Sequence, residues 1–142
     1  MRDLKTPQFK YAFKVFRKFP EENIPEDLRW VCYALDIVHP RDKDETVIQI
    51  FRELLEAVQK ERGVTPQEIA AKMGITRGTV LHHMKRLAHR GLVVRNGPLY
   101  ELREHSLSYS IDRVREDVNR YVNDILHVSE AIDRFYGLQA RR

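Results

Sequence analysis

The sequence predicts a mainly helical fold that carries one small β-hairpin, and three observations support this. Two short helices, each with its own start and stop signals, follow one another across a tight turn within residues 65–90. An Asn-Gly pair then separates two short apolar runs, which is the strongest short-range signal for a hairpin. From residue 107 onward, apolar residues recur with a period of 3.5, which predicts one long helix with a coiled-coil seam.

The size and composition fit one domain with an appendage. The chain has 142 residues, a formal net charge of +4 and a single cysteine, Cys32. One cysteine can form neither an intrachain disulfide nor a thiolate metal cluster. No apolar run approaches the roughly 20 residues of a membrane span, and the start of the chain lacks a secretory signal. We therefore expect a cytoplasmic protein without a membrane partner.

The N-terminal residues 7–19 are basic and aromatic. Phe9, Phe13 and Phe16 recur at helical spacing among lysines and arginines, which predicts an amphipathic basic helix. Every second residue from Phe9 to Val15 is also apolar, as in a strand, so a strand remains the alternative. Such a segment either packs on the core or on a dimer partner, or contacts phosphates or another protein.

Two further helices are expected before residue 64. Pro25, followed by two acidic residues, begins a helix that His39 and the next proline should end. Asp42, with a glutamate three residues later, begins another helix that continues to about Glu61 and stops at Gly63. This second helix carries a clear amphipathic stripe and should cover the back of the helices that follow.

Residues 65–91 contain the signals of a helix-turn-helix. Thr65 precedes a proline and, three residues later, a glutamate, which together form a capping box at a helix start. Gly74 tolerates the left-handed conformation that ends a helix. Thr76 is placed to cap a second helix, which runs to residues 88–90 and stops at Gly91. Two helices across such a short turn are typical of a helix-turn-helix.

The second helix has two distinct faces. Val80, Met84 and Leu87 form an apolar stripe that requires a core. The other face carries only hydrogen-bond donors of the kind that contact bases and phosphates, and it has no acidic residue. It consists of Thr79, His82, His83, Arg86 and Arg90, with Arg77 and Gly78 at the tip. An ordinary solvated face is the alternative, although such faces usually mix charges.

A hairpin follows this helix directly. Residues 92–95 and 98–102 alternate in the manner of strands, and Asn96-Gly97 lies between them. We expect positive φ at both of these turn residues. A hairpin in this place is a wing, and Arg95 and Asn96 at its tip would reach a neighbouring phosphate or the minor groove.

These residues resemble the winged helix-turn-helix regulators of the ArsR and MarR type. The pattern Thr79-Val80-x-His82-His83-Met84-Lys85-x-Leu87, leading into Gly91-Leu92-Val93, is closest to the ArsR-like proteins. The resemblance covers about residues 45–103 and implies a prokaryotic protein, with an archaeal source expected. It also implies a dimer whose second helix, residues 76–90, enters the DNA major groove, with the wing, residues 92–102, on the backbone or minor groove. The metal-sensing cysteines of many ArsR-like proteins are missing, so metal sensing is not carried over.

The charge distribution agrees with a nucleic-acid partner. Residues 65–103 hold seven Lys or Arg against two Glu, a local net charge of +5. Base contacts are expected from Arg77, Thr79, His82, His83 and Arg86, and phosphate or minor-groove contacts from Lys72, Lys85, Arg90 and Arg95. The full expected DNA-binding set is Thr65, Lys72, Thr76, Arg77, Gly78, Thr79, His82, His83, Lys85, Arg86, Arg90, Arg95 and Asn96.

The C-terminal segment is expected to dimerise the protein. Its seam residues are Leu107, Ile111, Val114, Val118, Tyr121, Ile125, Val128, Ile132 and Phe135. A helix of about 30 residues is ~45 Å long, too long for one small domain to cover, although a tail folded back on its own domain is the alternative. A dimer could place two recognition helices one DNA turn apart, ~34 Å, on an inverted repeat. The expected parts are an N-terminal helical extension (1–43), a winged helix-turn-helix DNA-binding domain (44–103) and a coiled-coil dimerisation helix (104–142).

Other chemistry finds no support in the sequence. His82 and His83 diverge by about 100° on a helix, and the other histidines lack ligand-spaced neighbours, so no metal, cofactor or enzymatic activity is expected. The expected function is a homodimeric, sequence-specific regulator of transcription that binds double-stranded DNA. The alternatives are a protein-interaction winged helix that docks onto a general transcription factor or RNA polymerase, and a non-specific architectural DNA binder.

Overall fold

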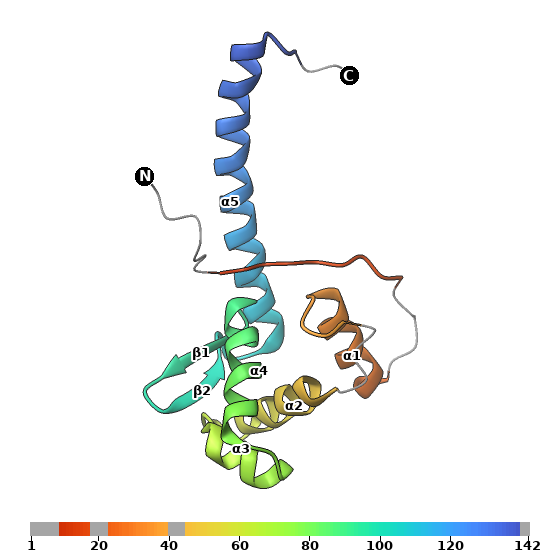
Figure 1. Cartoon of the computed structure of the whole chain (residues 1–142), viewed down its shortest axis with the longest axis vertical. Helices are drawn as coiled ribbons and strands as arrows, with labels where there is room; N and C mark the ends of the chain where they lie inside the picture. Colours follow the sequence, from red (N-terminus) through yellow and green to blue (C-terminus); the bar gives the residue numbers. More distant parts are fainter. Residues whose placement is uncertain (1–8, 18–22, 40–44, 140–142) are drawn as a thin grey trace.

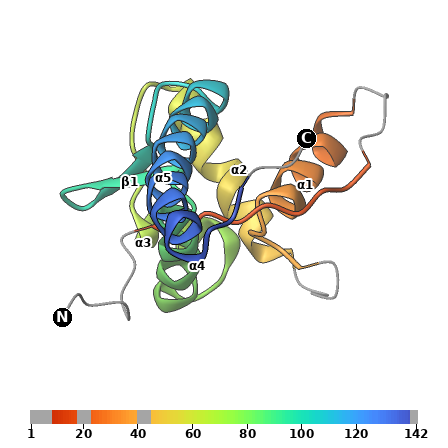
Figure 2. The same cartoon turned by 90° about the horizontal axis from the view of Figure 1, so that it is seen from above.

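The structure is a computed structural model that describes residues 9–17, 23–39 and 45–139. Its elements in chain order are α1 (Ile24–Ala34), α2 (Thr46–Gln59), α3 (Pro66–Met73), α4 (Arg77–His89), β1 (Val93–Asn96), β2 (Leu99–Leu102) and α5 (Leu107–Tyr136). Helices α1 to α4 and the hairpin form a body from which α5 rises (Figure 1). Seen along α5, the hairpin and α1 lie on opposite sides of the body (Figure 2). The predicted mainly α fold with a hairpin wing and a long C-terminal helix is confirmed.

One hydrophobic core joins parts that lie far apart in the sequence. It includes Leu28 and Cys32 of α1, Phe51 of α2, Met84 of α4 and Val114 of α5. Apolar burial is the dominant favourable term in folding, so these segments stabilise one another. The helix-turn-helix is therefore supported by residues on both sides of it in the chain.

Helix α1 begins as predicted but ends early. The Asn23 side chain accepts a hydrogen bond from the amide of Glu26, and a proline lies in the first turn. The helix stops at Ala34 instead of continuing to His39, because Asp36 adopts a left-handed conformation with φ 55°. This turn lets Ile37 enter the core, where it is fully buried.

Helix α2 begins later than the sequence suggested. The predicted start at Asp42 lies outside the described residues, and the helix begins at Thr46 with Glu45 at the N-cap. Glu45 makes no side-chain cap bond. Its carboxylate instead accepts two hydrogen bonds of 2.8 Å from the Arg29 guanidinium, which ties the start of α2 to α1. These bonds outweigh partial burial and lower the pKa of Glu45.

The predicted basic helix over residues 7–19 is wrong where the structure describes it. Residues 9–17, called the strap below, are extended and cross the body from α5 toward α1 (Figure 1). The backbone amide of Lys10 donates to the carbonyl of His89 at 2.9 Å, and the backbone amide of Lys14 donates to the carbonyl of Ala34 at 2.8 Å. His89 and Ala34 are the last residues of α4 and α1, so the strap satisfies carbonyls that helix ends leave open.

The hairpin turn differs from the expected one by a single residue. Asn96 pairs with Leu99, so the two turn residues are Gly97 and Pro98. Only Gly97 has positive φ, 61°, which corresponds to a turn with glycine at its first central position. The expectation of positive φ at Asn96 is therefore corrected. Val64 pairs with Tyr100 and adds a short third partner beside the hairpin.

Helix α5 has the predicted limits but only part of the predicted exposure. The Ser106 hydroxyl accepts from the amide of Tyr109 at its start, and left-handed Gly137 ends it. The first half of the seam packs on the body of its own chain. That half consists of Leu107, Ile111, Val114 and Val118. The continuous intermolecular seam predicted from Leu107 is thus corrected, because those four positions are occupied by the chain's own core.

Candidate nucleic-acid interface

The helix-turn-helix is held by two threonine caps. The Thr65 hydroxyl accepts from the amide of Glu68 at 3.2 Å, and the Thr76 hydroxyl accepts from that of Thr79 at 3.1 Å. Gly74, with φ 69°, supplies the left-handed residue between the two helices. The Glu68 carboxylate pairs with Arg62 at 3.0 Å, so half of the predicted capping box is formed. The two threonine hydroxyls therefore stabilise the starts of α3 and α4.

The most exposed face of α4 lies directly opposite the core. Val80, Met84 and Leu87 are fully buried. At 100° per residue, the positions opposite them follow a spacing of four, three and four residues along the helix. They are Gly78, His82, Lys85 and His89, called the α4 ridge below, and all four are exposed. His89 was missing from the predicted set, although a helical projection centred on the buried stripe would have found it.

The predicted positions on one flank of α4 face the body instead. Arg86 is exposed, but its guanidinium donates to the carbonyl of Ile37 at 3.0 Å. Arg90 is only 8% exposed. It donates to the carbonyls of Leu35, Lys10 and Asp36 at 2.9–3.1 Å, and it forms an ion pair with the Asp36 carboxylate at 3.3 Å.

Arg90 is therefore unavailable to a phosphate, and its predicted role is corrected. The early end of α1 exposes carbonyls that need donors, and the planar five-donor guanidinium supplies them. The carboxylate of Asp36 is also stabilised in this region. Its hydrogen bond with Lys14, together with the charges of the nearby arginines, lowers the pKa of Asp36.

Lys72 of α3, a predicted phosphate contact, forms ion pairs within the protein. Its ammonium lies 2.8 Å from the Glu53 carboxylate and 3.6 Å from that of Glu56, both on α2. The hydrogen bond with Glu53 is the main reason that the pKa of Lys72 is raised. Two carboxylates offset one ammonium, so a DNA phosphate gains little attraction there. The predicted phosphate contact at Lys72 is not supported by this geometry.

The remaining predicted residues lie at the start of α4 and on the wing. Arg77 and Thr79 are exposed, whereas His83 is half-buried, with its ring centroid 5.4 Å from that of His82. Arg95 is exposed and donates from Nε to the carbonyl of Gly97 at 2.8 Å, so its guanidinium lies over the turn of the wing. Asn96 instead donates its side-chain amide to Glu101 across the hairpin at 3.2 Å.

The exposed charge of this surface is almost entirely positive. Helix α4 carries no acidic residue. Its exposed cations and histidines, taken with the wing, are Arg77, His82, Lys85, Arg86, His89 and Arg95. The hairpin contributes one carboxylate, Glu101, which the Asn96 amide engages. A surface of this sign, along a helix and an adjacent wing, attracts a polyanion.

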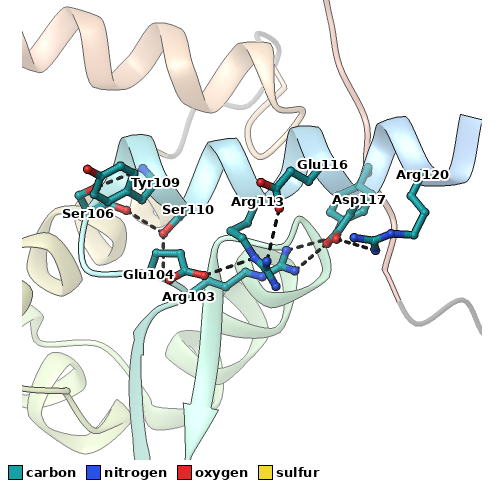
Figure 3. A network of polar contacts seen from close by, with 10 residues as sticks. Arg103, Glu104, Ser106, Tyr109, Ser110, Arg113, Glu116, Asp117 and Arg120 are labelled. Atoms are coloured by element: carbon teal, nitrogen blue, oxygen red, sulfur yellow. Dashed lines mark hydrogen bonds and ion pairs between the residues drawn. The ribbon is translucent and has the colours of Figure 1, made fainter.

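An ion-pair network that the sequence analysis missed connects the wing to α5 (Figure 3). Arg103 donates to the Asp117 carboxylate at 2.6 Å, and the hydroxyl of Tyr11 donates to it at 2.7 Å. The Arg103 guanidinium also lies 5.6 Å from the centre of the Phe9 ring. Burial would raise the pKa of Asp117, but the hydrogen bonds from Tyr11 and Arg103 outweigh it and lower that pKa. No local sequence pattern indicates a contact between Tyr11 and Asp117, which are 106 positions apart in the chain.

Among residues 9–17, 23–39 and 45–139, no three His, Cys, Asp or Glu side chains come together as a metal site. No helix within these residues combines the length and apolar character needed to cross a membrane.

Comparison with known proteins agrees with this geometry. Residues 49–94 match the model of a family described as winged helix-turn-helix DNA-binding. The match runs from α2 into β1 and covers about a third of the chain. No curated protein and no solved structure matched the sequence. The capped helix pair, the basic α4 ridge and the hairpin lie in or beside the matched segment, and the chain therefore carries a winged helix-turn-helix of the DNA-binding kind.

Proposed function

We propose that the protein is a homodimeric transcription regulator of the ArsR/MarR-like type that binds specific sequences in double-stranded DNA. The observation that carries this proposal is the α4 ridge. It is exposed and free of acidic residues, and it lies opposite the buried stripe of a helix within the segment that matches DNA-binding winged helices.

Helix α4 has the dimensions for direct readout of bases. The major groove, about 12 Å wide, admits one α-helix with its side chains. His82 would face the base edges, and Arg77, at the N-terminal tip of α4 with Thr79 nearby, is able to pair a guanine with two hydrogen bonds. Lys85 would contact a phosphate. Arg95, over the turn of the wing, would contact the adjacent backbone or minor groove. These contacts follow the usual docking of a helix-turn-helix, whose second helix enters the groove by its N-terminal part.

The second half of α5 supports the homodimer. Tyr121, Ile125, Val128, Ile132 and Phe135 are between 49% and 81% exposed. An apolar stripe of this length on a charged helix marks an interaction surface. A second copy would cover it, and the two-fold pair would bind an inverted repeat, because symmetric dimers read symmetric sites.

A selection from a randomised DNA pool tests the function. The full-length protein would be titrated with salt while bound to a pool of randomised duplexes, and the bound fraction sequenced. Arg77→Ala and Lys85→Ala would be run beside Arg52→Ala, which replaces an exposed arginine of α2. An enriched inverted repeat that Arg77→Ala and Lys85→Ala bind more weakly and Arg52→Ala binds as well as the wild type supports the proposal. Salt-sensitive binding without enrichment indicates an architectural DNA binder, and no binding at low salt rejects DNA as the partner.

A second candidate function, docking onto the transcription machinery, is favoured by the strap. Phe13 is 55% exposed and Val15 is fully exposed, and both lie on a segment rich in lysine and arginine. Such a segment could contact RNA polymerase or a general transcription factor. A Phe13→Ser/Val15→Ser variant that keeps operator affinity but loses binding to purified polymerase or factor would support this role. Unchanged binding of the variant to both proteins would reject it.

A further inference from the structure

The apolar face of α5 is covered in the first half of the helix and exposed in the second half. Up to Val118 its apolar residues pack on the body of the same chain. Beyond that point the stripe continues with the same spacing of three and four residues, and from Tyr121 to Phe135 it is exposed. At 100° per residue, both parts of the stripe lie on the same side of the helix. The body and the free stripe therefore face the same direction.

This arrangement blocks a parallel pair of α5 helices. In a parallel pair that meets along the exposed stripe, the first half of each helix runs beside the first half of the other. That space is already filled by the body, because each body lies on the side from which the second helix would approach. The strap also crosses α5 there, where Tyr11 donates to Asp117 at 2.7 Å. In an antiparallel pair, the body of each chain begins where the helix of the other chain ends, and the two bodies do not meet.

The residues beside the stripe favour the same arrangement. If the stripe is written as positions a and d of a heptad, the e positions are Val122, Ser129 and Tyr136, which carry no charge. The g positions include Asp117 and Asp124. In a parallel pair, each e position lies beside a g position of the other helix, so Val122 would lie beside the carboxylate of Asp117. In an antiparallel pair, each e position lies beside an e position of the other helix. Antiparallel pairing therefore keeps Val122 and Tyr136, both exposed in the single chain, away from carboxylates of the second helix.

We infer that two copies of this chain pair through antiparallel α5 helices, which overlap from Val118 to Phe135 and hold the winged helices at opposite ends. The inference rests on the proposed homodimer and specifies its geometry. The register with the longest overlap places Val118 opposite Phe135, Tyr121 opposite Ile132, and Ile125 opposite Val128. Each pair occurs twice, because a two-fold axis relates the copies.

This geometry sets the distance between the two DNA-binding domains. In the stated register, residue 112 of one copy lies 29 residues along the helix axis from residue 112 of the other. At 1.5 Å per residue that distance is about 44 Å, more than the ~34 Å of one DNA turn. The half-sites of an operator should therefore be centred more than one turn apart, not one turn as the sequence alone suggested.

Disulfide crosslinking of the full-length protein tests the orientation. Tyr121→Cys and Ile132→Cys would be made separately and oxidised alone or after mixing. Cys32 stays in place, since it is fully buried and burial raises the pKa of its thiol to about 12. In the antiparallel dimer, the two copies of residue 121 are about 16 Å apart along the axis, too far for a disulfide. Asn123→Cys, on the polar side of α5, mixed with Ile132→Cys serves as the matched control.

The expected result is a covalent dimer from the mixture of Tyr121→Cys and Ile132→Cys, with almost none from either variant alone or from the control mixture. A covalent dimer from Tyr121→Cys alone would show parallel helices and overturn the inference, while leaving the homodimer in place. A dimer by light scattering that crosslinks in no combination would also overturn it, by moving the interface away from α5. A monomer by light scattering would reject the proposed homodimer itself.

Discussion

The Arg103 guanidinium donates to the Asp117 carboxylate at 2.6 Å, and the two side chains are only 14% and 12% exposed. Arg103 follows the last strand of the wing, and Asp117 lies about a third of the way along α5. Tyr11 of the strap donates to the same carboxylate. One carboxylate therefore connects the wing, the strap and α5.

Replacing this carboxylate should destabilise the protein. Asp117→Asn removes the charge that Arg103 needs in a poorly solvated site, which should cost about 2–3 kcal/mol of unfolding free energy. Urea unfolding at neutral pH measures this loss. Asp124→Asn, which removes an exposed acid from the same helix, serves as the control and should change the free energy by less than about 0.5 kcal/mol.

The same variant should change how stability depends on pH. Because the pKa of Asp117 is lowered in the folded protein, its contribution is complete above its unfolded pKa of about 3.9. It is lost as the pH falls through the lower, folded value. Wild type should therefore lose more stability than Asp117→Asn between about pH 5 and pH 2. Parallel stability curves for the two proteins would contradict the proposed charge of Asp117.

Arg90 should prove to be a structural residue. Arg90→Ala leaves the carbonyls of Leu35, Lys10 and Asp36 without this donor and should cost about 3 kcal/mol of unfolding free energy. Arg90→Lys should recover little, because one ammonium cannot match the planar fork of donors. Arg86→Ala, which removes one hydrogen bond from an exposed side chain, is the matched control and should cost about 1 kcal/mol or less. An Arg90→Ala protein of normal stability and weakened DNA binding would restore the phosphate role expected from the sequence.

Two lysines on adjacent helices should differ in their effect on DNA binding. Lys85 is exposed on the α4 ridge, whereas Lys72 lies between two carboxylates of α2. Lys85→Ala should reduce the slope of log affinity against log salt by about 1, and Lys72→Ala should leave it nearly unchanged. Fluorescence anisotropy over a series of KCl concentrations measures both slopes. Equal reductions in the two variants would mean that α3 also contacts the phosphates.

Two helix-ending glycines should respond differently to alanine. Both have positive φ, 69° at Gly74 and 80° at Gly91. A Cβ at Gly74 meets nothing within 4 Å, so Gly74→Ala should cost only the conformational penalty, about 1 kcal/mol. A Cβ at Gly91 would lie 2.6 Å from Tyr11 Cε1 and 3.1 Å from Val114 Cγ2, which should add about 1–3 kcal/mol.

A double-mutant cycle identifies the source of the extra cost at Gly91. If the clash with Tyr11 is responsible, Gly91→Ala should cost less when Tyr11 is already alanine. Thermal and urea unfolding of the four proteins would measure this. Strictly additive effects would show that backbone strain alone explains the loss.

A charge in the exposed half of α5 should separate the proposed dimer without unfolding the body. Ile125→Glu places a carboxylate in the centre of the proposed overlap and should yield a folded monomer by light scattering. Asn123→Glu, on the polar side of the same turn, should leave the protein dimeric. A chain that stops after Arg120 should also be monomeric. Removing all residues from 106 onward would instead delete Val114 from the core and unfold the protein.

The helix limits that were predicted correctly depend on local chemistry. Thr65, Thr76 and Gly74 act through hydrogen bonds or backbone conformations within a few residues, and these can be recognised in a sequence. The failures depend on distant partners. The strap is extended because the ends of α1 and α4 offer carbonyls to its amides, and the left-handed Asp36 that shortens α1 has no strong local signal.

The candidate site was predictable in part for the same reason. The basic character of α4 follows from its composition, whereas its outward direction depends on where the core lies. Of the expected face, His82 lies on the α4 ridge. Its other members, Thr79, His83, Arg86 and Arg90, lie on a flank of the helix, and Arg90 is enclosed by the strap and the end of α1. Taking the face opposite Val80, Met84 and Leu87 would have given the α4 ridge from sequence alone.

Gly91 has a consequence for how this protein can change over evolution. At this residue the end of α4, the strap and α5 lie within contact distance of one another. A larger residue in any of the three requires a smaller one in another, so the three segments must evolve together. Residues 45–103, grafted alone onto another protein, would lose Tyr11 and Val114 and expose the apolar surface beneath them. The winged helix of this chain is therefore not a portable module.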